Sequence, residues 1–300
     1  MRRFVPSLFL AASLAALPWL VSDFLLSLAL TCLMFVALAS SWAMFSGATN
    51  YLSLATSAFF GIGAYVTAWG LETLPYAVLV PLGGLAAAAF AALVGAAVLH
   101  LRGAYFAVLT FGLGELVRHA ITYSEKTYAR TVGRVIMDAP ESVTVYLTVL
   151  VLACVTVAAC AAVRASRFGL ALAGIGADEE RAQTLGVNTR LAKIGGFALA
   201  AFFAGALGAA IAVRWTYIEP ASVFNPFIGF QTVLIAMVGG AQTLIGPIVS
   251  AVVFSIATEL LRLQFPYAYL LVLGTLLIAL VLYLPGGLAS VVLRWRRADA

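Results

Sequence analysis

The sequence is poor in charged residues. Asp, Glu, Lys and Arg make up 10% of its 300 residues, against about 25% in a typical soluble chain. Its 17 basic and 12 acidic side chains are too few to cover a soluble globule of this size, and hydrophobic residues reach 64%. A soluble protein is therefore excluded. Apolar runs of about twenty residues, rather than alternating strands of about ten, predict an all-α polytopic membrane protein.

Cysteine and histidine are also scarce. Cys32, Cys154 and Cys160 lie inside apolar runs, with neither the spacing of metal ligands nor a pattern that defines disulfides. His100 and His119 are too scattered to form a metal site, so none is predicted. The net charge of +5 does not indicate nucleic-acid binding, because basic residues of membrane proteins gather in cytoplasmic loops.

No phosphate-binding loop is present. The pattern G-x-x-x-x-G-K-[ST] needs Gly before Lys, but the two lysines, Lys126 and Lys193, follow Glu125 and Ala192. No Ser-His-Asp, zinc or paired-carboxylate pattern indicates an enzyme within the membrane. The chain is therefore predicted to be no enzyme and to bind no cofactor. Any ATP, with its Mg, must be bound by another subunit.

Ten apolar runs bounded by Gly, Pro or charge predict about ten transmembrane helices in a single membrane domain, 1–300. They lie at about 7–21, 24–46, 51–70, 76–101, 103–123, 142–163, 193–215, 227–243, 245–264 and 267–285. The first run is short and follows Arg2 and Arg3, so a signal peptide is an alternative. A retained span is favoured, because no clear small-x-small cleavage site precedes Asp23 and a second run follows almost at once.

The basic residues favour one orientation of these spans. With the N-terminus inside, 11 of the 17 basic residues fall on the cytoplasmic side: Arg2, Arg3, Arg102, Arg164, Arg167, Arg181, Arg190, Lys193, Arg294, Arg296 and Arg297. Lysine and arginine are enriched in cytoplasmic loops of membrane proteins. Both termini are therefore predicted to be cytoplasmic.

Two polar loops interrupt the apolar pattern, an outer one at about 124–141 and an inner one at about 164–192. The inner loop is predicted to contain a short helix, with Asp178 as its N-cap and Gly186 as its terminator. A helix of about seven residues is unstable alone, so its flanking spans or a partner must support it.

The residues of this short helix suggest two roles. Glu179 and Glu180 suit its first turn, and Ala182 and Leu185, three apart, form a small apolar face. Such a helix can lie in the groove of a cytoplasmic motor subunit. An ordinary polar loop between two spans is the alternative.

Several motifs resemble one transporter family. Glu180-Arg181-Ala182-x-x-x-Gly186 is similar to the E-A-A-x-x-x-G loop of ABC-importer permeases, with Arg181 in place of the first alanine. Further segments resemble the branched-chain amino acid ABC-importer permease family, in family order: SLATSAFFGIGAY (53–65), LRGAY (101–105), GLGELVR (112–118), AAFFAGALGA (200–209), VGG (238–240), GP (246–247) and ELLR (259–262). The resemblance covers about 20–290 and is closest to the second of the family's two paralogous permease types.

The resemblance implies a type II ABC-importer-like permease in a bacterial cell (inner) membrane. In this family the loop contacts the ATPase subunits, so the expected coupling residues are Asp178, Glu179, Glu180, Arg181, Ala182, Leu185 and Gly186. The implied partners are a second paralogous permease in a heterodimer, two cytoplasmic ATP-binding subunits and a periplasmic or surface substrate-binding protein. The implied substrates are branched-chain or related hydrophobic amino acids.

The sequence departs from the family pattern at positions where contact with the substrate or the binding protein is expected. Ala55-Thr56 stands where the family commonly has Gly-His, and Asn50-Tyr51 where it has Gly-Gln. Thr131-Val132-Gly133-Arg134 replaces a Thr-Gly-Gly-x-Asn-Gly stretch of the outer loop. An importer of the same type for urea, short amides or aromatic or organic acids is therefore an alternative.

The candidate translocation path centres on the third apolar run, whose glycines permit close helix approach or local unwinding. Its expected residues are Ser53, Thr56, Phe59, Gly61, Gly63, Tyr65 and Glu115. Glu115 with Arg118, and Glu259 with Arg262, have the spacing of structural ion pairs. An ion-coupled secondary transporter or a channel acting alone is an alternative of another class. It would need an ion site, and the spans hold few acids beyond Glu115 and Glu259.

Overall fold

The computed structural model describes residues 13–101, 103–136, 139–265, 271 and 274–275. Its elements, in chain order, are the 3-10 helix η1 (Leu17–Trp19), α2 (Asp23–Thr49), α3 (Thr56–Gly70), α4 (Tyr76–Val98), α5 (Ala104–Ser124), the π-helix η2 (Glu125–Ala129), β1 (Arg134–Val135), α6 (Ser142–Ala165), α7 (Arg167–Ala177), α8 (Glu179–Thr184), α9 (Thr189–Ala212), β2 (Tyr217–Ile218), α10 (Pro220–Val223), α11 (Pro226–Gly239) and α12 (Ile245–Gln264).

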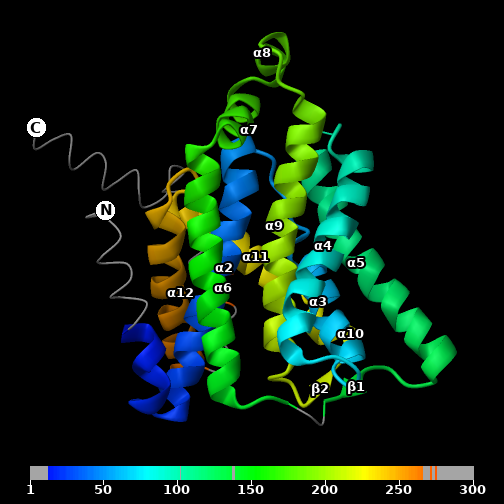
Figure 1. Cartoon of the computed structure of the whole chain (residues 1–300), viewed down its shortest axis with the longest axis vertical. Helices are drawn as coiled ribbons and strands as arrows, with labels where there is room; N and C mark the ends of the chain where they lie inside the picture. The colour runs from blue at the N-terminus through cyan, green and yellow to red at the C-terminus, as the bar shows by residue number, and fades with distance from the viewer. Residues whose placement is uncertain (1–12, 102, 137–138, 266–270, 272–273, 276–300) are drawn as a thin grey trace, which may run out of the picture.

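Most of the long helices run along one direction, and the bundle has two distinct ends (Figure 1). α7 and α8 lie at one end, called here the α8 end, and β1 and β2 lie at the other, the strand end. Helix α9 is the centre of the packing, since its contacts with α4 and α3 are the most extensive between any two described elements. α5 leans away from the bundle (Figure 1).

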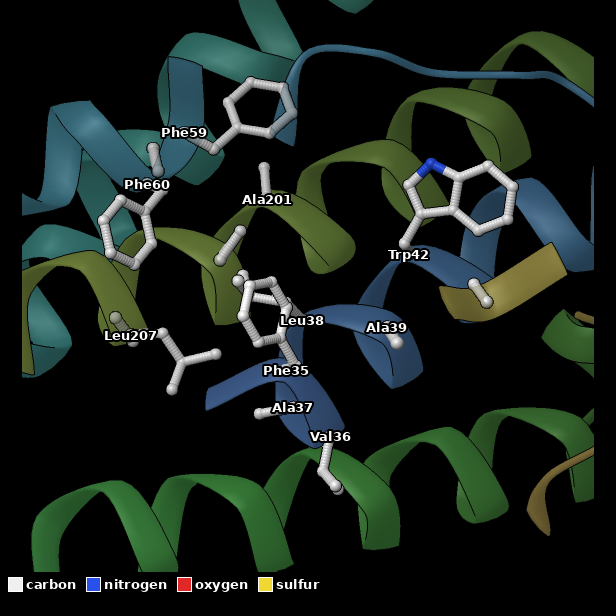
Figure 2. Close-up of a cluster of buried hydrophobic side chains, with 14 of the residues drawn as sticks. Phe35, Val36, Ala37, Leu38, Ala39, Trp42, Phe59, Phe60, Ala201 and Leu207 are labelled. Atoms are coloured by element: carbon white, nitrogen blue, oxygen red, sulfur yellow. The ribbon is translucent and has the colours of Figure 1, made fainter. Parts of the chain in front are cut away.

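The core lies where α2, α3 and α9 meet. Phe35, Leu38 and Trp42 of α2 are buried beside Phe59 and Phe60 of α3, and Ala201 and Leu207 of α9 complete the cluster (Figure 2). Apolar side chains gain little from leaving lipid, so close packing rather than water exclusion holds such helices together. Small residues on α9 are what allow this packing.

Glycines bring α3 and α9 into backbone contact. A Cβ atom at Gly63 would overlap the carbonyl group of Gly205, and one at Gly208 would overlap the carbonyl group of Phe60. Neither position has room for a methyl group, whereas packed transmembrane helices with larger residues stand farther apart. The two helices therefore form one rigid unit through the middle of the bundle.

Among the described residues, six stretches are long and apolar enough to cross a membrane: Asp23–Thr49, Tyr76–Val98, Ser142–Ala165, Thr189–Ala212, Pro220–Gly239 and Ile245–Gln264. They correspond to six of the predicted runs. α3 has 15 residues and α5 carries Glu115, Arg118 and His119, and neither is among the six. Residues 13–21 of the predicted run at 7–21 are described, whereas the run at 267–285 lies almost wholly outside the described residues.

The all-α class is confirmed, and the described residues add one short strand pairing beside the helices. β1 and β2 pair antiparallel, with Arg134 opposite Ile218 and Val135 opposite Tyr217. The two strands come from loops far apart in sequence, and two residues are too short for a strand pattern to show. This pairing joins the outer loop at 124–141 to the segment that follows α9.

We expect Gly63→Ala to loosen the bundle. Its new methyl group would meet the Gly205 carbonyl, and overpacking of this kind costs about 1–3 kcal/mol. The thermal melting temperature of the purified protein in detergent should fall. Gly112→Ala on α5 is the matched control, because a Cβ there meets nothing within 4 Å. Equal melting temperatures for the two variants would contradict the close contact.

Candidate functional site

The inner loop is more ordered than its polar composition suggests. Residues 167–177 form α7, which the sequence interpretation did not include, and α9 begins at Thr189. Leu172 and Ile175 of α7 are buried, and a Cβ atom at Gly176 would overlap the Ala48 carbonyl at the end of α2. α7 therefore packs on α2 and supports the short helix that follows it.

Helix α8 has the ends that its residues predict. The Asp178 side chain accepts hydrogen bonds from two backbone N–H groups of the first turn, at 3.0 and 3.1 Å. At the other end Gly186 has φ +87°, and Val187 N donates to Ala182 O (3.0 Å) while Gly186 N donates to Gln183 O (2.9 Å). This is the Schellman motif, in which a left-handed residue closes the helix.

Ala182 of α8 and Leu185, the residue directly after α8, face opposite ways, so the predicted shared apolar face is wrong. Ala182 is 4% exposed and turns toward the protein, whereas Leu185 is 84% exposed. The reason is that Leu185 lies past the last helical residue, where the chain turns toward Gly186. Arg181 pairs with Asp178 (3.1 Å) on the exposed side. α8 therefore presents Leu185 and charged side chains outward.

Glu179, the first residue of α8, is the exception because it points inward. Its carboxylate pairs with Lys193 of α9 at 2.7 Å, and the two side chains are only 9% and 6% exposed. The sequence counts Lys193 among the basic residues of the cytoplasmic side and gives no sign that its side chain is buried. Its ammonium group also donates to Leu99 O at the end of α4 (2.7 Å) and to Tyr51 Oη (3.1 Å). An ammonium group has three protons to donate, so all three are used.

Tyr51 and Asn50 complete this arrangement from the segment between α2 and α3. The Tyr51 hydroxyl donates to Glu179 Oε2 (2.8 Å), and the Asn50 side-chain amide donates to Gly176 O (2.9 Å). In the sequence, Asn50-Tyr51 stands out only as a departure from the family pattern. Tyr51 lies 128 residues from Glu179 and 142 from Lys193, so no local spacing could have joined them.

Three of the expected path residues share one internal cavity. Ser53, Thr56 and Phe59 line a cavity of about 20 Å³, together with residues of α2 and α9: Ser41, Trp42, Phe45, Ser46, Phe197, Ala200 and Ala204. The Trp42 indole N–H donates to Ser53 O (2.8 Å), and Ser46 Oγ is buried without a hydrogen-bond partner. A cavity of this volume holds about one water molecule. The cavity is therefore too small to hold an organic molecule in this conformation.

The other expected path residues lie elsewhere. Gly61 packs against the Phe224 ring and Gly63 against Gly205, so both serve helix packing, and α3 is continuous rather than unwound. The Tyr65 hydroxyl donates to Glu125 Oε2 (3.3 Å) toward the strand end. Glu115 is on α5, away from the cavity.

The two Glu-Leu-x-Arg segments behave differently. Glu115 and Arg118 form an ion pair at 2.5 Å, with His119 Nε2 3.8 Å from the same carboxylate oxygen. Glu259 and Arg262, both described residues of α12, form no ion pair, so that pairing is corrected. Both side chains are at least partly exposed near the end of α12, where a water-solvated rotamer costs little.

Glu125 anchors the outer loop, and the sequence interpretation missed it. Its side chain is buried, Oε2 accepts from the Gly133 N–H (2.8 Å) and from Tyr65, and Oε1 lies 4.0 Å from Arg134 Nε. The acid closes the loop on itself and joins it to α3. Among the residues that the structure describes, no group of three or more His, Cys, Asp or Glu side chains could hold a metal ion.

A bundle of membrane-crossing helices with a short capped helix at one end has the form of a transporter's membrane subunit. The family model for the branched-chain amino acid transport system permease component matches residues 24–281, and the chain belongs to this family. It is thus an ABC-transporter permease, a multi-pass membrane protein that is not itself the ATPase.

Two curated relatives are similar over most of the chain. The high-affinity branched-chain amino acid transport system permease protein LivM of Escherichia coli K12 is 27% identical, over 94% of this chain and 74% of the relative. LivM of Salmonella typhimurium LT2 matches with the same identity and coverage. No solved structure matches the chain.

We expect Glu125→Ala to release the outer loop. The substitution removes a charged acceptor whose hydrogen bonds are worth about 1.5–3 kcal/mol, so hydrogen exchange of the Gly133 amide should speed up by at least about tenfold. Glu141→Ala is the control, because Glu141 is an exposed acid of the same loop whose side chain does not cap α6. Unchanged exchange at Gly133 would show that Glu125 does not hold the loop.

Proposed function

We propose that this permease imports branched-chain or related hydrophobic amino acids, driven by ATP hydrolysis in separate subunits. The observation that supports the coupling role is the orientation of α8. Glu179 anchors α8 to the bundle, whereas Leu185 and Arg181 are exposed on its outer side. In this proposal α8 is the coupling helix, and its end of the bundle is cytoplasmic. Both termini lie on that side, and about ten spans cross the bacterial inner membrane.

The exposed side of α8 is where the ATPase subunits dock. An apolar side chain as exposed as Leu185 suits burial in a groove, with Glu180 and Arg181 as polar contacts around it. Asp178 and Gly186 set the two ends of α8 and thus hold this surface in place. Ala182 packs against the protein on the inner side of α8.

A second, paralogous permease covers α5. This helix leans away from the bundle (Figure 1). Its apolar side chains Tyr105, Val108 and Leu116 are exposed. Its Glu115–Arg118 pair is more than a quarter exposed, which is costly at membrane depth unless a neighbour or headgroups cover it. A substrate-binding protein docks on the outer loops at the strand end.

The substrate class is supported by the cavity and by the relatives' names. Aromatic rings of Trp42, Phe45, Phe59 and Phe197 surround a few hydroxyl groups, an apolar lining that suits an aliphatic side chain. The relatives carry the name of a high-affinity branched-chain amino acid system. Alternating access then requires this cavity to widen when the ATPases close and move α8.

The substrate is tested with the cognate binding protein, identified as the binding-protein gene beside the permease gene. Calorimetry should show tight binding of leucine, isoleucine or valine and none of urea, acetamide or benzoate. Leucine uptake by cells should stop on ATP depletion and continue when the proton gradient is collapsed. Binding of urea, an amide or an organic acid instead would contradict the substrate class. Transport by this chain alone in liposomes would contradict the importer.

The coupling role is tested at Gly186. Gly186→Val should abolish co-purification of the ATPase subunits while membrane insertion is kept, because valine is strained at φ +87°. A Cβ there meets nothing within 4 Å, so only the backbone conformation is changed. Gly186→Asn is the matched control, since asparagine tolerates the left-handed region. Full ATPase association in the valine variant would count against α8 as the coupling helix.

A further inference from the structure

Four separate parts of the chain meet at the Lys193 ammonium group. Glu179 comes from α8, Leu99 O from the end of α4, Tyr51 from the segment before α3, and Lys193 itself from α9. Tyr51 and Glu179 also bond to each other, so the contacts form a closed network. We call Tyr51, Glu179 and Lys193 the α8 joint.

A buried ion pair such as that of the α8 joint is weak evidence for a role in stability. Removing two charges from water costs several kcal/mol for each ion, and well-packed apolar residues are often as stable or more stable in such places. A buried pair instead fixes the position of the two elements that carry it relative to each other. Hydrogen bonds of 2.7 Å weaken sharply when their atoms separate, and separation here would leave two buried charges unpaired. α8 therefore cannot shift alone without a large cost.

The α8 joint also lies directly beside the cavity. Phe197 follows Lys193 by one helical turn on α9, and Ser53 follows Tyr51 by two residues, and both Phe197 and Ser53 line the cavity. Beyond the cavity, glycine contacts hold α3 and α9 together. A displacement of α8 thus passes through the α8 joint into α9 and into the segment before α3, both of which supply residues to the cavity lining.

We infer that Tyr51, Glu179 and Lys193 are the positioning residues that convert movement of α8 into opening of the cavity. They act through α3 and α9 and need not touch the substrate. The inference rests on the proposed function in two respects, that α8 docks on the ATPases and that the cavity is part of the substrate path. It adds which contacts inside this chain carry the movement onward.

The test uses the full complex in proteoliposomes, with the cognate ATPase subunits, second permease and binding protein. The main variant is Tyr51→Phe/Glu179→Leu/Lys193→Met, which replaces the α8 joint by apolar residues of similar size. Two quantities are measured, leucine imported per ATP hydrolysed and nucleotide-dependent hydrogen exchange. The melting temperature and the co-purification of the ATPase subunits should be normal. Import per ATP should fall at least about fivefold, which is the low end of the range that coupling between two sites ordinarily gives.

Hydrogen exchange gives a readout that needs no substrate and that a purely structural role would not move. In the wild type, a non-hydrolysable ATP analogue should change exchange in α8, in 50–56 and at the start of α9. In the triple variant the change should be confined to α7 and α8. A triple variant with unchanged import per ATP, or with the wild-type exchange pattern, overturns the inference. A wild type whose response stops at α8 overturns it too.

If the triple variant fails to fold, a milder variant tests the inference. Tyr51→Phe removes only the hydroxyl that bridges Glu179 and Lys193, and it should lower import per ATP. Tyr146→Phe is the matched control, because this buried hydroxyl bonds to Leu14 O at 3.0 Å, away from α8. Equal coupling in the two overturns the inference. A wild-type complex that does not import leucine overturns the proposed substrate, while the exchange measurement still reports on the α8 joint.

Discussion

Gly63 on α3 and Gly205 and Gly208 on α9 let two backbones touch in the middle of the membrane domain. In lipid, apolar side chains gain little by meeting each other, so helices associate through close packing and internal hydrogen bonds. The contact places the aromatic rings of both helices around a common interior, and it makes α3 and α9 respond as one body. The α3 and α9 walls of the cavity are therefore held relative to each other, and α2 supplies the remaining wall.

Charge is used sparingly and is concentrated at the two ends of this rigid unit. At the α8 end, Glu179 and Lys193 are buried and fully hydrogen-bonded to Tyr51 and Leu99 O. At the strand end, Glu125 fastens the outer loop to Tyr65 of α3. Each end of α3 is therefore tied to a loop that faces a different partner in the proposed importer. Such ties cost desolvation energy, which is consistent with a role beyond stability.

The long helices follow closely from the sequence, because an apolar run of about twenty residues has few alternatives in a bilayer. Asp178 and Gly186 also predict the ends of α8, since capping depends on neighbouring residues alone. The sequence did not predict α7, because the charged residues Arg164, Arg167 and Asp178 at or near its ends indicate a polar loop. The outward turn of Leu185 was missed because a three-residue spacing holds only within a helix.

The sequence by itself determined the membrane class, the absence of a phosphate-binding loop and the family to which the motifs belong, because these depend on composition and local pattern. Only the tertiary structure decided that Lys193 is buried rather than solvated, that Tyr51 meets Glu179, and that Ser53, Thr56 and Phe59 share a cavity while Glu115 lies apart. Contacts between residues more than a hundred positions apart depend on how helices pack, and packing depends on the shapes of all the surfaces at once.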